Sequence, residues 1–146
     1  MNNLNIPIYR AKKIDSDEYV IGNLIEDEGV FYIIKNPVVT HFNGLQQLTG
    51  ECEYLDRVDP TILAINLPDM LDSKGNKIFA SLSEDGKGGD KMLKGVDMEQ
   101  YGLKNTYYTA ICTRGSVLLK ELYESTSISC TAHGFLTELK VIGIQK

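Results

Sequence analysis

Val30-Phe31-Tyr32-Ile33-Ile34, which directly follows the turn Glu26-Asp27-Glu28-Gly29, is the stretch that decides the fold class. The turn is polar and ends in glycine, the residue that adopts positive φ most readily, and the five residues after it are β-branched or aromatic. We therefore predict a β-hairpin whose arms cover 18–25 and 30–34. Because both faces of the second arm are apolar, this strand should lie inside a sheet or barrel wall, away from an exposed edge.

The rest of the chain repeats this pattern, because Gly, Asp, Asn or Pro interrupts short β-prone runs about every ten residues. Further strands are predicted at 6–14, 61–67, 77–79, 106–113, 127–132 and 139–144. A short helix is predicted over 117–123 behind Ser116 as N-cap, because Leu118, Leu119, Leu122 and Tyr123 fall at helical spacing. The stretch 41–59 is predicted to be loop, and 81–90 an exposed, mobile loop. The expected fold is mainly β to α+β: a strand-dominated small barrel or packed sheets with one short helix.

Length and composition place the chain among single-domain globular proteins. Its 146 residues correspond to one domain, 1–146, and 42% hydrophobic with 24% charged residues is an average balance. No apolar run reaches the roughly 18 to 20 residues that cross a bilayer, and the first residues lack the pattern of a secretory signal. Three cysteines, Cys52, Cys112 and Cys130, are an odd number and widely spaced, so we do not expect a disulfide framework. We expect a cytoplasmic protein without a membrane segment.

Three patches, in chain order, resemble the YopX-like proteins of bacteriophages and prophages. The first patch looks like the family's opening strand, its turn and its aromatic-x-x-Gly second strand. The second is similar to an Asp-Pro-x-Thr element followed by an Asp-Lys-Asn-Gly turn and an Ile-Phe strand, and the third to a closing Val-Ile-Gly strand. The patches are Ile8-Tyr9-Arg10-Ala11-Lys12 with Glu18-Tyr19-Val20-Ile21-Gly22-Asn23-Leu24; Val58-Asp59-Pro60-Thr61 with Asp72-Ser73-Lys74-Gly75-Asn76-Lys77-Ile78-Phe79; and Glu138-Leu139-Lys140-Val141-Ile142-Gly143-Ile144.

The chain departs from that family's pattern at several positions. Tyr19 stands where the family usually has Trp, and Ala80 to Asp90 replaces a compact Glu-Gly-Asp ending. The resemblance implies a phage or prophage accessory protein, of bacterial cytoplasmic location, with a mixed, strand-dominated fold. It implies no catalytic residues, and it marks the shared glycines and aromatics as structural.

The loop 81–90 supplies the candidate binding residues Asp85, Lys87 and Asp90. Backbone N–H groups and the lysine of Gly86-Lys87-Gly88-Gly89 could hold a phosphate, although the strand–Gly-x-x-x-x-Gly-Lys–helix context of a P-loop is not met. Together with Asp69, Asp72 and Glu84, its acids could also bind calcium, but they lack the register of a calcium loop. The competing interpretation is a floppy loop with solvated acids.

Cysteine and histidine offer a second set of candidates. Cys130 and His133, with Cys112, could supply three zinc ligands, and a thiol could pair with His41 or His133 as a nucleophile. Structural zinc usually takes four ligands, and no orienting third residue can be named for a nucleophilic pair. Buried cysteines and a turn histidine account for these residues equally well.

A third candidate is the only basic run, Tyr9-Arg10-Ala11-Lys12-Lys13, which could stack on and neutralise single-stranded nucleic acid. Together with Arg57 it could form a positive face. The net charge of −5 argues against a general nucleic-acid surface, and an edge strand protected by solvated charges is the competing interpretation.

The sequence thus predicts a non-catalytic module that binds a protein partner or self-associates, without cofactor or metal. Its eight tyrosines are compatible with an interaction surface. The alternatives are a nucleic-acid-associated factor and a small metal-dependent or cysteine hydrolase.

Overall fold

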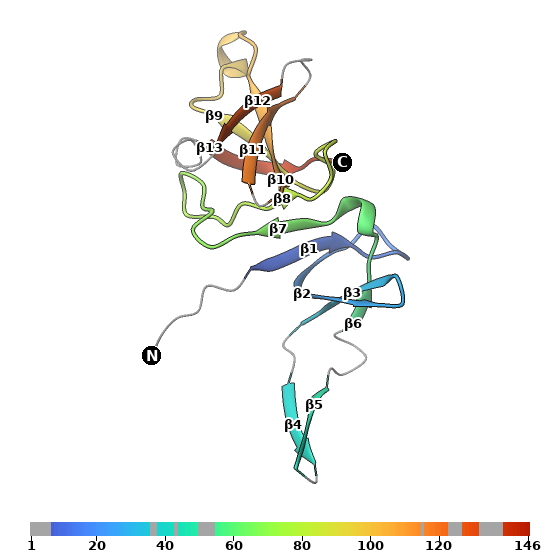
Figure 1. Ribbon diagram of the computed structural model, residues 1–146. Helices are drawn as coiled ribbons and strands as arrows, with labels where there is room; N and C mark the ends of the chain where they lie inside the picture. Colours follow the sequence, from blue (N-terminus) through green and yellow to red (C-terminus); the bar gives the residue numbers. More distant parts are fainter. Residues whose placement is uncertain are drawn as a thin grey trace.

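The computed structural model describes residues 7–35, 38–42, 44–49, 55–114, 116–122, 127–131 and 139–146. Most of the strands join one eleven-stranded sheet, which curls into half a barrel (Figure 1). Its strand order is β12-β11-β10-β8-β7-β1-β2-β3-β6, and β9 adds to β10 and carries β13. A separate hairpin joins β4 and β5. The strands are β1 (Ile8–Lys12), β2 (Tyr19–Asp27), β3 (Val30–Ile34), β4 (Val38–Phe42), β5 (Leu45–Thr49), β6 (Leu55–Arg57), β7 (Ala64–Asn66), β8 (Ala80–Ser81), β9 (Asp90–Lys94), β10 (Tyr107–Thr113), β11 (Ser116–Glu121), β12 (Ser127–Thr131) and β13 (Leu139–Ile144).

The predicted hairpin at 18–34 is confirmed. Strands β2 and β3 pair from Asn23↔Ile34 to Asp27↔Val30, which leaves a two-residue turn. Glu28 and Gly29 both have positive φ, 49° and 78°, as a type I′ hairpin turn requires. β3 lies between β2 and β6, and Ile33 and Ile34 are buried, so the expected interior position is confirmed as well.

Strand β2 pairs with two different strands along its length. Its residues 19–22 pair with β1, and its residues 23–27 pair with β3. Gly22 stands at the change of partner, where a Cβ atom would lie 2.5 Å from the carbonyl oxygen of Ile34. Only glycine lets the two backbones come this close, so the glycine of the aromatic-x-x-Gly motif has a structural role.

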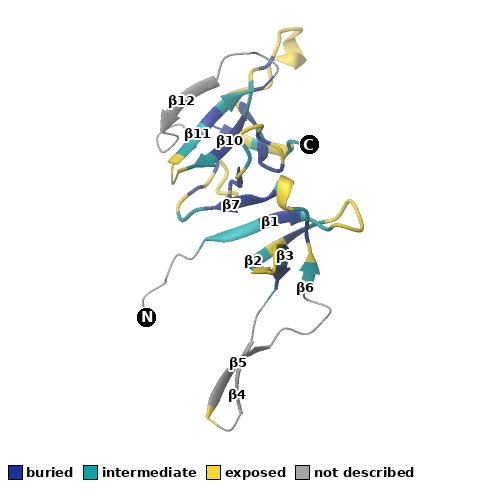
Figure 2. Cartoon of the chain, turned by 45° about the vertical axis from the view of Figure 1, so that its right-hand side comes forward, coloured by how far each residue is buried: buried dark blue, intermediate teal, exposed yellow. Residues whose placement is uncertain are grey.

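Two clusters of buried side chains fill the two ends of the sheet. The first contains Ala11, Val20, Ile33, Val58 and Leu63. The second contains Met70, Ile78, Ala80, Met92, Ala110, Leu119 and Leu139. Strands β1 and β7 pair between them, and Figure 2 shows buried residues along both strands.

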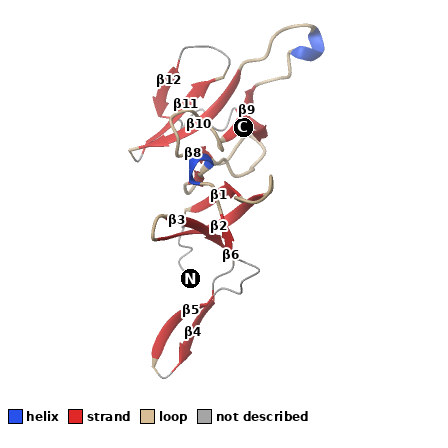
Figure 3. Cartoon of the chain, turned by 90° about the vertical axis from the view of Figure 1, so that its right-hand side faces the viewer, coloured by secondary structure: helices blue, strands red, loops and turns tan. Residues whose placement is uncertain are grey.

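Three predicted elements are wrong: the helix over 117–123, the loop over 41–59 and the strand over 77–79. The expected helix over 117–123 is largely strand β11, which pairs with β10 on one side and β12 on the other. The stretch 41–59, predicted to be loop, contains β5 and β6. The helical turns of the described residues are two short 3-10 segments, η2 (Pro60–Ile62) and η3 (Glu99–Tyr101) (Figure 3).

Other predicted strands are confirmed with shifted ends. The strand expected over 61–67 is reduced to β7 because Pro60–Ile62 is η2. The strand expected over 77–79 is wrong, because Lys77 makes only an isolated bridge to Leu71 and the next strand is β8, at Ala80–Ser81. The strands at 106–113, 127–132 and 139–144 correspond to β10, β12 and β13. None of the helical segments in the described part of the chain has the length and apolar character to cross a bilayer.

Candidate functional site

The structure separates the three candidate residues of the 81–90 loop. Asp85 and Lys87 are exposed, and their charged groups lie 3.9 Å apart. Asp90 is the first residue of β9 and is 1% exposed. The loop is exposed only in part: Leu82, Glu84, Asp85 and Lys87 are exposed as predicted, whereas its three glycines, Gly86, Gly88 and Gly89, are buried. Binding by this loop stays a prediction.

Close backbone packing explains the glycines. A Cβ on Gly88 would lie 2.3 Å from the carbonyl oxygen of Ile62, and one on Gly89 would lie 2.9 Å from the carbonyl oxygen of Ala110. Gly88 N–H donates to the carbonyl of Gln145, and Gln145 N–H donates to Gly89. The loop therefore ties η2 and the C-terminal segment together.

Asp90 forms a buried ion pair with Arg10 of β1. The Arg10 Nη1 atom lies 2.7 Å from Asp90 Oδ1, and Nη2 donates to the carbonyl oxygen of Gly88 at 2.7 Å. The second carboxylate oxygen accepts the N–H of Phe79 at 2.8 Å, and the Phe79 ring lies 4.6 Å from the guanidinium carbon. Burial raises the pKa of Asp90, although Arg10 and the Phe79 N–H favour its ionised form. The acidic residue that we expected to be solvated is thus a buried anchor between the two ends of the sheet.

The basic run does not form a positive edge. β1 lies between β2 and β7 and so is not an edge strand, and the paired Arg10 is 7% exposed. Lys13 lies 3.0 Å from Glu18 and 3.5 Å from Asp56, and the hydrogen bond to Glu18 raises the pKa of Lys13. The nucleic-acid alternative needs a positive face. The central arginine of that face is buried in an ion pair, and Lys13 is paired with acidic residues.

The candidate metal ligands do not converge within the described residues, which contain no group of three His, Cys, Asp or Glu side chains able to hold a metal. Asp72 is buried and uses its oxygens inside the protein, accepting the N–H groups of Lys74, Asn76 and Val141. Burial raises the pKa of the Cys112 thiol, which disfavours the nucleophilic thiolate. The side chains of Cys52, Cys130, His41 and His133 lie outside the described residues.

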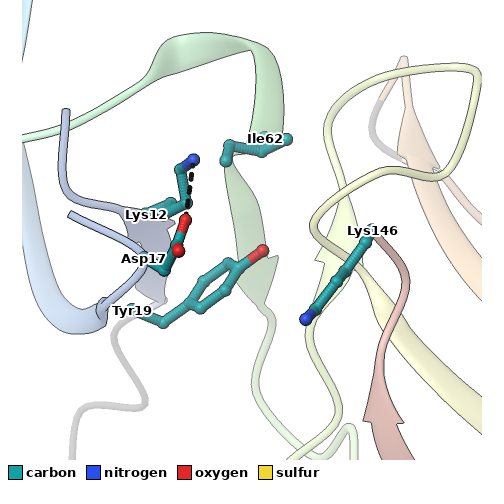
Figure 4. A pocket seen from close by; sticks show the side chains of 5 residues that line it. All are labelled: Lys12, Asp17, Tyr19, Ile62 and Lys146. Atoms are coloured by element: carbon teal, nitrogen blue, oxygen red, sulfur yellow. Dashed lines mark ion pairs between the residues drawn. The ribbon is translucent and has the colours of Figure 1, made fainter. Parts of the chain in front are cut away.

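A cleft of about 300 Å³ is lined by side chains from five segments. Lys12 comes from β1, Asp17 from the following turn, Tyr19 from β2, and Lys146 from the end of the chain, while Ile62 of η2 forms an apolar wall. The Lys12 ammonium lies 3.6 Å from the fully exposed Asp17 carboxylate. Figure 4 shows the Tyr19 ring between this pair and Lys146, whose side chain runs back toward the ring.

A second feature, the tip, is the segment 95–106 between β9 and β10, which stands away from the sheet in Figure 3. Four of its apolar side chains are exposed: Val96 (61%), Met98 (37%), Tyr101 (68%) and Leu103 (55%). The sequence analysis did not identify this segment. The available signal was an apolar residue at nearly every second or third position of a glycine-bounded stretch without strand character.

Hydrogen bonds give the tip a defined shape. The buried Asn105 accepts the N–H of Met98 at 2.6 Å and donates to Asp97 at 2.8 Å. Asp97 also accepts the N–H of Glu99, and the Asn105 and Glu99 hydrogen bonds lower the pKa of Asp97. Tyr107 Oη lies within hydrogen-bonding distance of Asn105 and donates to Glu99. Gly102, with φ 77°, closes η3.

Comparison with known proteins gave no relative: no family model, no curated protein and no solved structure matches the chain. The likeness to YopX-like proteins therefore stays a resemblance of motifs.

Proposed function

We propose that this protein is a non-catalytic binding module that docks on a partner protein through the tip. The observation that carries the proposal is the set of four exposed apolar side chains on a hydrogen-bonded frame, Val96, Met98, Tyr101 and Leu103. Removing apolar surface from water is the main driving force of protein association. Four of the ten large apolar side chains that are exposed in the described residues belong to this one short segment.

The hydrogen-bonded frame of the tip favours a binding role over an exposed apolar surface without a function. Asn105, Asp97 and Glu99 direct their polar groups to each other and to Tyr107. A loop that is already ordered loses less conformational entropy when it binds, so more of the apolar contact energy appears as affinity. Tyr101, the most exposed of the four, belongs to a residue type enriched at the energetic centres of interfaces.

The shape of the tip favours a concave partner over a second copy of the chain. A stable interface uses roughly 20 to 30 residues on each side, which exceeds what the tip can offer to a flat symmetric contact. A groove that encloses the tip would contact it from several sides at once. We therefore propose a different protein with an apolar groove as the occupant.

The setting that we propose is the cytoplasm of a bacterium carrying a phage or prophage. The three YopX-like patches support it, and the structure gives the shared motifs physical roles: Gly22 allows the close approach of β2 and β3, and Asp72 organises the turn that ends at Asn76. Both are structural roles, which agrees with a family resemblance carried by the fold.

Site-specific photo-crosslinking in cells that naturally express the chain tests the proposal. A benzophenone side chain is placed at Tyr101 in one strain and at the exposed Lys74 in another. We expect a covalent adduct of one defined mass with the first and not with the second. Adding Leu103→Asp should abolish that adduct, whereas Leu82→Asp, an equally drastic change at an exposed leucine outside the tip, should leave it.

Two results would contradict the proposal. One is equal labelling from both positions, which would indicate chance contacts. The other is an adduct at Tyr101 that survives Leu103→Asp, because the apolar tip would then contribute nothing to the contact. The retained fold of each variant is checked by circular dichroism.

A further inference from the structure

We propose that the β4–β5 hairpin joins two copies of this chain, with β4 of one copy pairing antiparallel with β4 of the other. The hairpin is a separate two-stranded sheet, which stands away from the eleven-stranded sheet in Figure 1 and Figure 3. An isolated two-stranded hairpin is at best marginally stable in water, and three or more strands are needed for independent stability. Pairing through β4 gives one four-stranded sheet, β5-β4-β4′-β5′, where the primes mark the second copy.

The edges of this hairpin lack the protection that proteins usually give to exposed strands. Residues 38–49 contain no Asp, Glu, Lys, Arg or Pro, in a chain of which 24% of the residues are charged. The register between β4 and β5 has no bulge, and within the residues that the structure describes neither strand pairs with a third one. Charges, prolines and bulges are the features that keep an edge strand from pairing with another chain. This hairpin is therefore open to such pairing.

Two edge strands of the eleven-stranded sheet are protected, in contrast. On β6, the carbonyl oxygen of Arg57 accepts the N–H of Ile14 at 3.0 Å. On β13, the N–H of Val141 donates to Asp72, and a shift of register interrupts the strand. The chain thus covers these edges with its own groups but leaves the edges of the hairpin uncovered, which favours an intermolecular partner for the hairpin.

The register of the hairpin determines which backbone groups of β4 face outward. Residues 38–42 pair with residues 45–49, so a two-residue turn joins the strands. The residues that flank such a turn form a hydrogen-bonded pair, and hydrogen-bonded and non-hydrogen-bonded pairs alternate along an antiparallel ladder. Phe42 and every second residue before it therefore bond to β5. The N–H and C=O groups of Val39 and His41 are directed outward, to the free edge.

The sequence of β4 is complementary to itself about Thr40. When two copies pair antiparallel with Thr40 opposite Thr40, Val39 of each copy lies opposite His41 of the other. The outward N–H and C=O groups of the two copies then satisfy each other. The same register sets Val38 opposite Phe42, and β-branched–aromatic and Thr–Thr pairs are both favourable across strands. A two-fold axis through Thr40 limits this contact to two copies.

The charge of the protein favours a second copy at this strand over a second copy elsewhere. Two chains of net charge −5 repel each other, and an uncharged strand lets them meet with the least local repulsion. β4 is the better edge because four of its five residues are β-branched or aromatic, against one of five in β5. Two five-residue strands make a small interface, so we expect a dissociation constant roughly in the micromolar range.

Sedimentation velocity of the purified chain over a range of concentrations tests the proposal, and we expect a monomer–dimer equilibrium. Thr40→Lys places two like charges opposite each other and should raise the dissociation constant about fivefold or more. The matched control is Gln47→Lys, which adds the same charge on β5 opposite Thr40. In the four-stranded sheet the two copies of residue 47 are three strand spacings apart, roughly 14 Å, so this control should change the constant less than about twofold.

A charge swap separates the proposed register from general effects of charge. One added lysine changes the net charge of −5 to −4, which by itself weakens the repulsion between copies, so dissociation of Thr40→Lys must have a local cause. Thr40→Glu should dissociate as well. An equimolar mixture of Thr40→Lys and Thr40→Glu should dimerise again, because only the two-fold register sets residue 40 of both copies opposite each other. The tip variant Tyr101→Asp with Leu103→Asp should leave the dimer unchanged, which keeps this test separate from that of the proposed function.

Three results would overturn the proposal. A wild type that stays monomeric at every concentration would leave a different protein as the partner of the hairpin. Equal weakening by Thr40→Lys and Gln47→Lys would show that β4 does not form the contact. A mixture of Thr40→Lys and Thr40→Glu that stays monomeric would contradict the register about Thr40.

Discussion

At the residue scale, the Arg10–Asp90 pair connects strands that are 80 positions apart in the chain. The cost of burying two charges can exceed their attraction, so such a pair adds little net stability, but leaving one partner alone is costly. We predict that Asp90→Ala lowers the free energy of unfolding by about 3 to 5 kcal/mol, because Arg10 stays buried without its counter-ion. Urea unfolding followed by circular dichroism measures this loss.

The control for this prediction is a double variant. Arg10→Met combined with Asp90→Leu replaces both charges by apolar groups and should restore most of the stability lost by Asp90→Ala. A cost below about 1 kcal/mol for the single variant would show that the pair is not buried in solution.

A second residue-scale prediction concerns two glycines with the same backbone conformation. Gly75 and Gly88 have φ values of 81° and 83°, but a Cβ meets nothing within 4 Å at Gly75 and the Ile62 backbone at Gly88. Gly75→Ala should therefore cost about 1 to 2 kcal/mol for the left-handed conformation alone. Gly88→Ala should cost a further 1 to 3 kcal/mol, roughly, for overpacking. Equal midpoints in thermal unfolding would refute the close packing of the 81–90 loop.

At the scale of elements, the tip depends on Asn105. Removing its side chain in Asn105→Ala leaves the N–H of Met98 and one oxygen of Asp97 without this partner. We predict faster hydrogen exchange at Met98 and Glu99 with little change in global stability, because residues 95–104 are exposed.

Tyr107→Phe is the matched comparison for Asn105→Ala. It removes the hydroxyl that contacts Asn105 and Glu99 but keeps the backbone bond to Met98, so its effect on Met98 exchange should be smaller. Unchanged exchange at Met98 in Asn105→Ala would mean that the tip is not held by this network.

Elements whose signals are local could be predicted from sequence, as the hairpin at 18–34 illustrates. Its polar turn and β-branched arm leave few alternatives, and the structure adds only the positive φ of Glu28. The helix predicted over 117–123 failed for a physical reason. Leu118, Leu119 and Leu122 satisfy helical spacing, but backbone pairing with β10 and β12, the strands before and after β11 in the chain, decides the outcome.

The candidate sites depended on long-range contacts. The glycines at 86–89 indicated mobility, yet they serve close approach to Ile62 and Ala110. Nothing in the local sequence pairs Arg10 with Asp90 or brings Lys146 to Tyr19. The cleft and the buried pair could therefore be found only once the fold was known.

At the scale of the whole molecule, the response to acid depends on carboxylates with opposite shifts. Burial alone would raise the pKa of Asp72, but hydrogen bonds from Val141, Asn76 and Lys74 outweigh burial and lower it. A group with a lowered pKa stabilises the fold above its unfolded pKa of about 3.9, and this contribution is lost as the pH falls through the folded value. Asp90 has a raised pKa and so acts in the opposite direction: its ionisation lowers the stability of the fold as the pH rises.

We therefore predict that stability falls below about pH 4 and that Asp72→Asn makes this fall shallower, because it removes one group that must be protonated. Urea midpoints between pH 3 and pH 7 measure the slope. An identical slope in the wild type and in Asp72→Asn would show that this carboxylate does not bind fewer protons in the folded state.

The central claim, a binding module that acts through the tip, is tested most directly by native mass spectrometry. The wild type and the variant Tyr101→Asp with Leu103→Asp are isolated gently and in parallel from cells that naturally express the chain. The claim predicts a complex of the wild type with a second protein and a free, folded variant. The same metal or small molecule on both, with no protein partner on either, would contradict it and point to an enzyme.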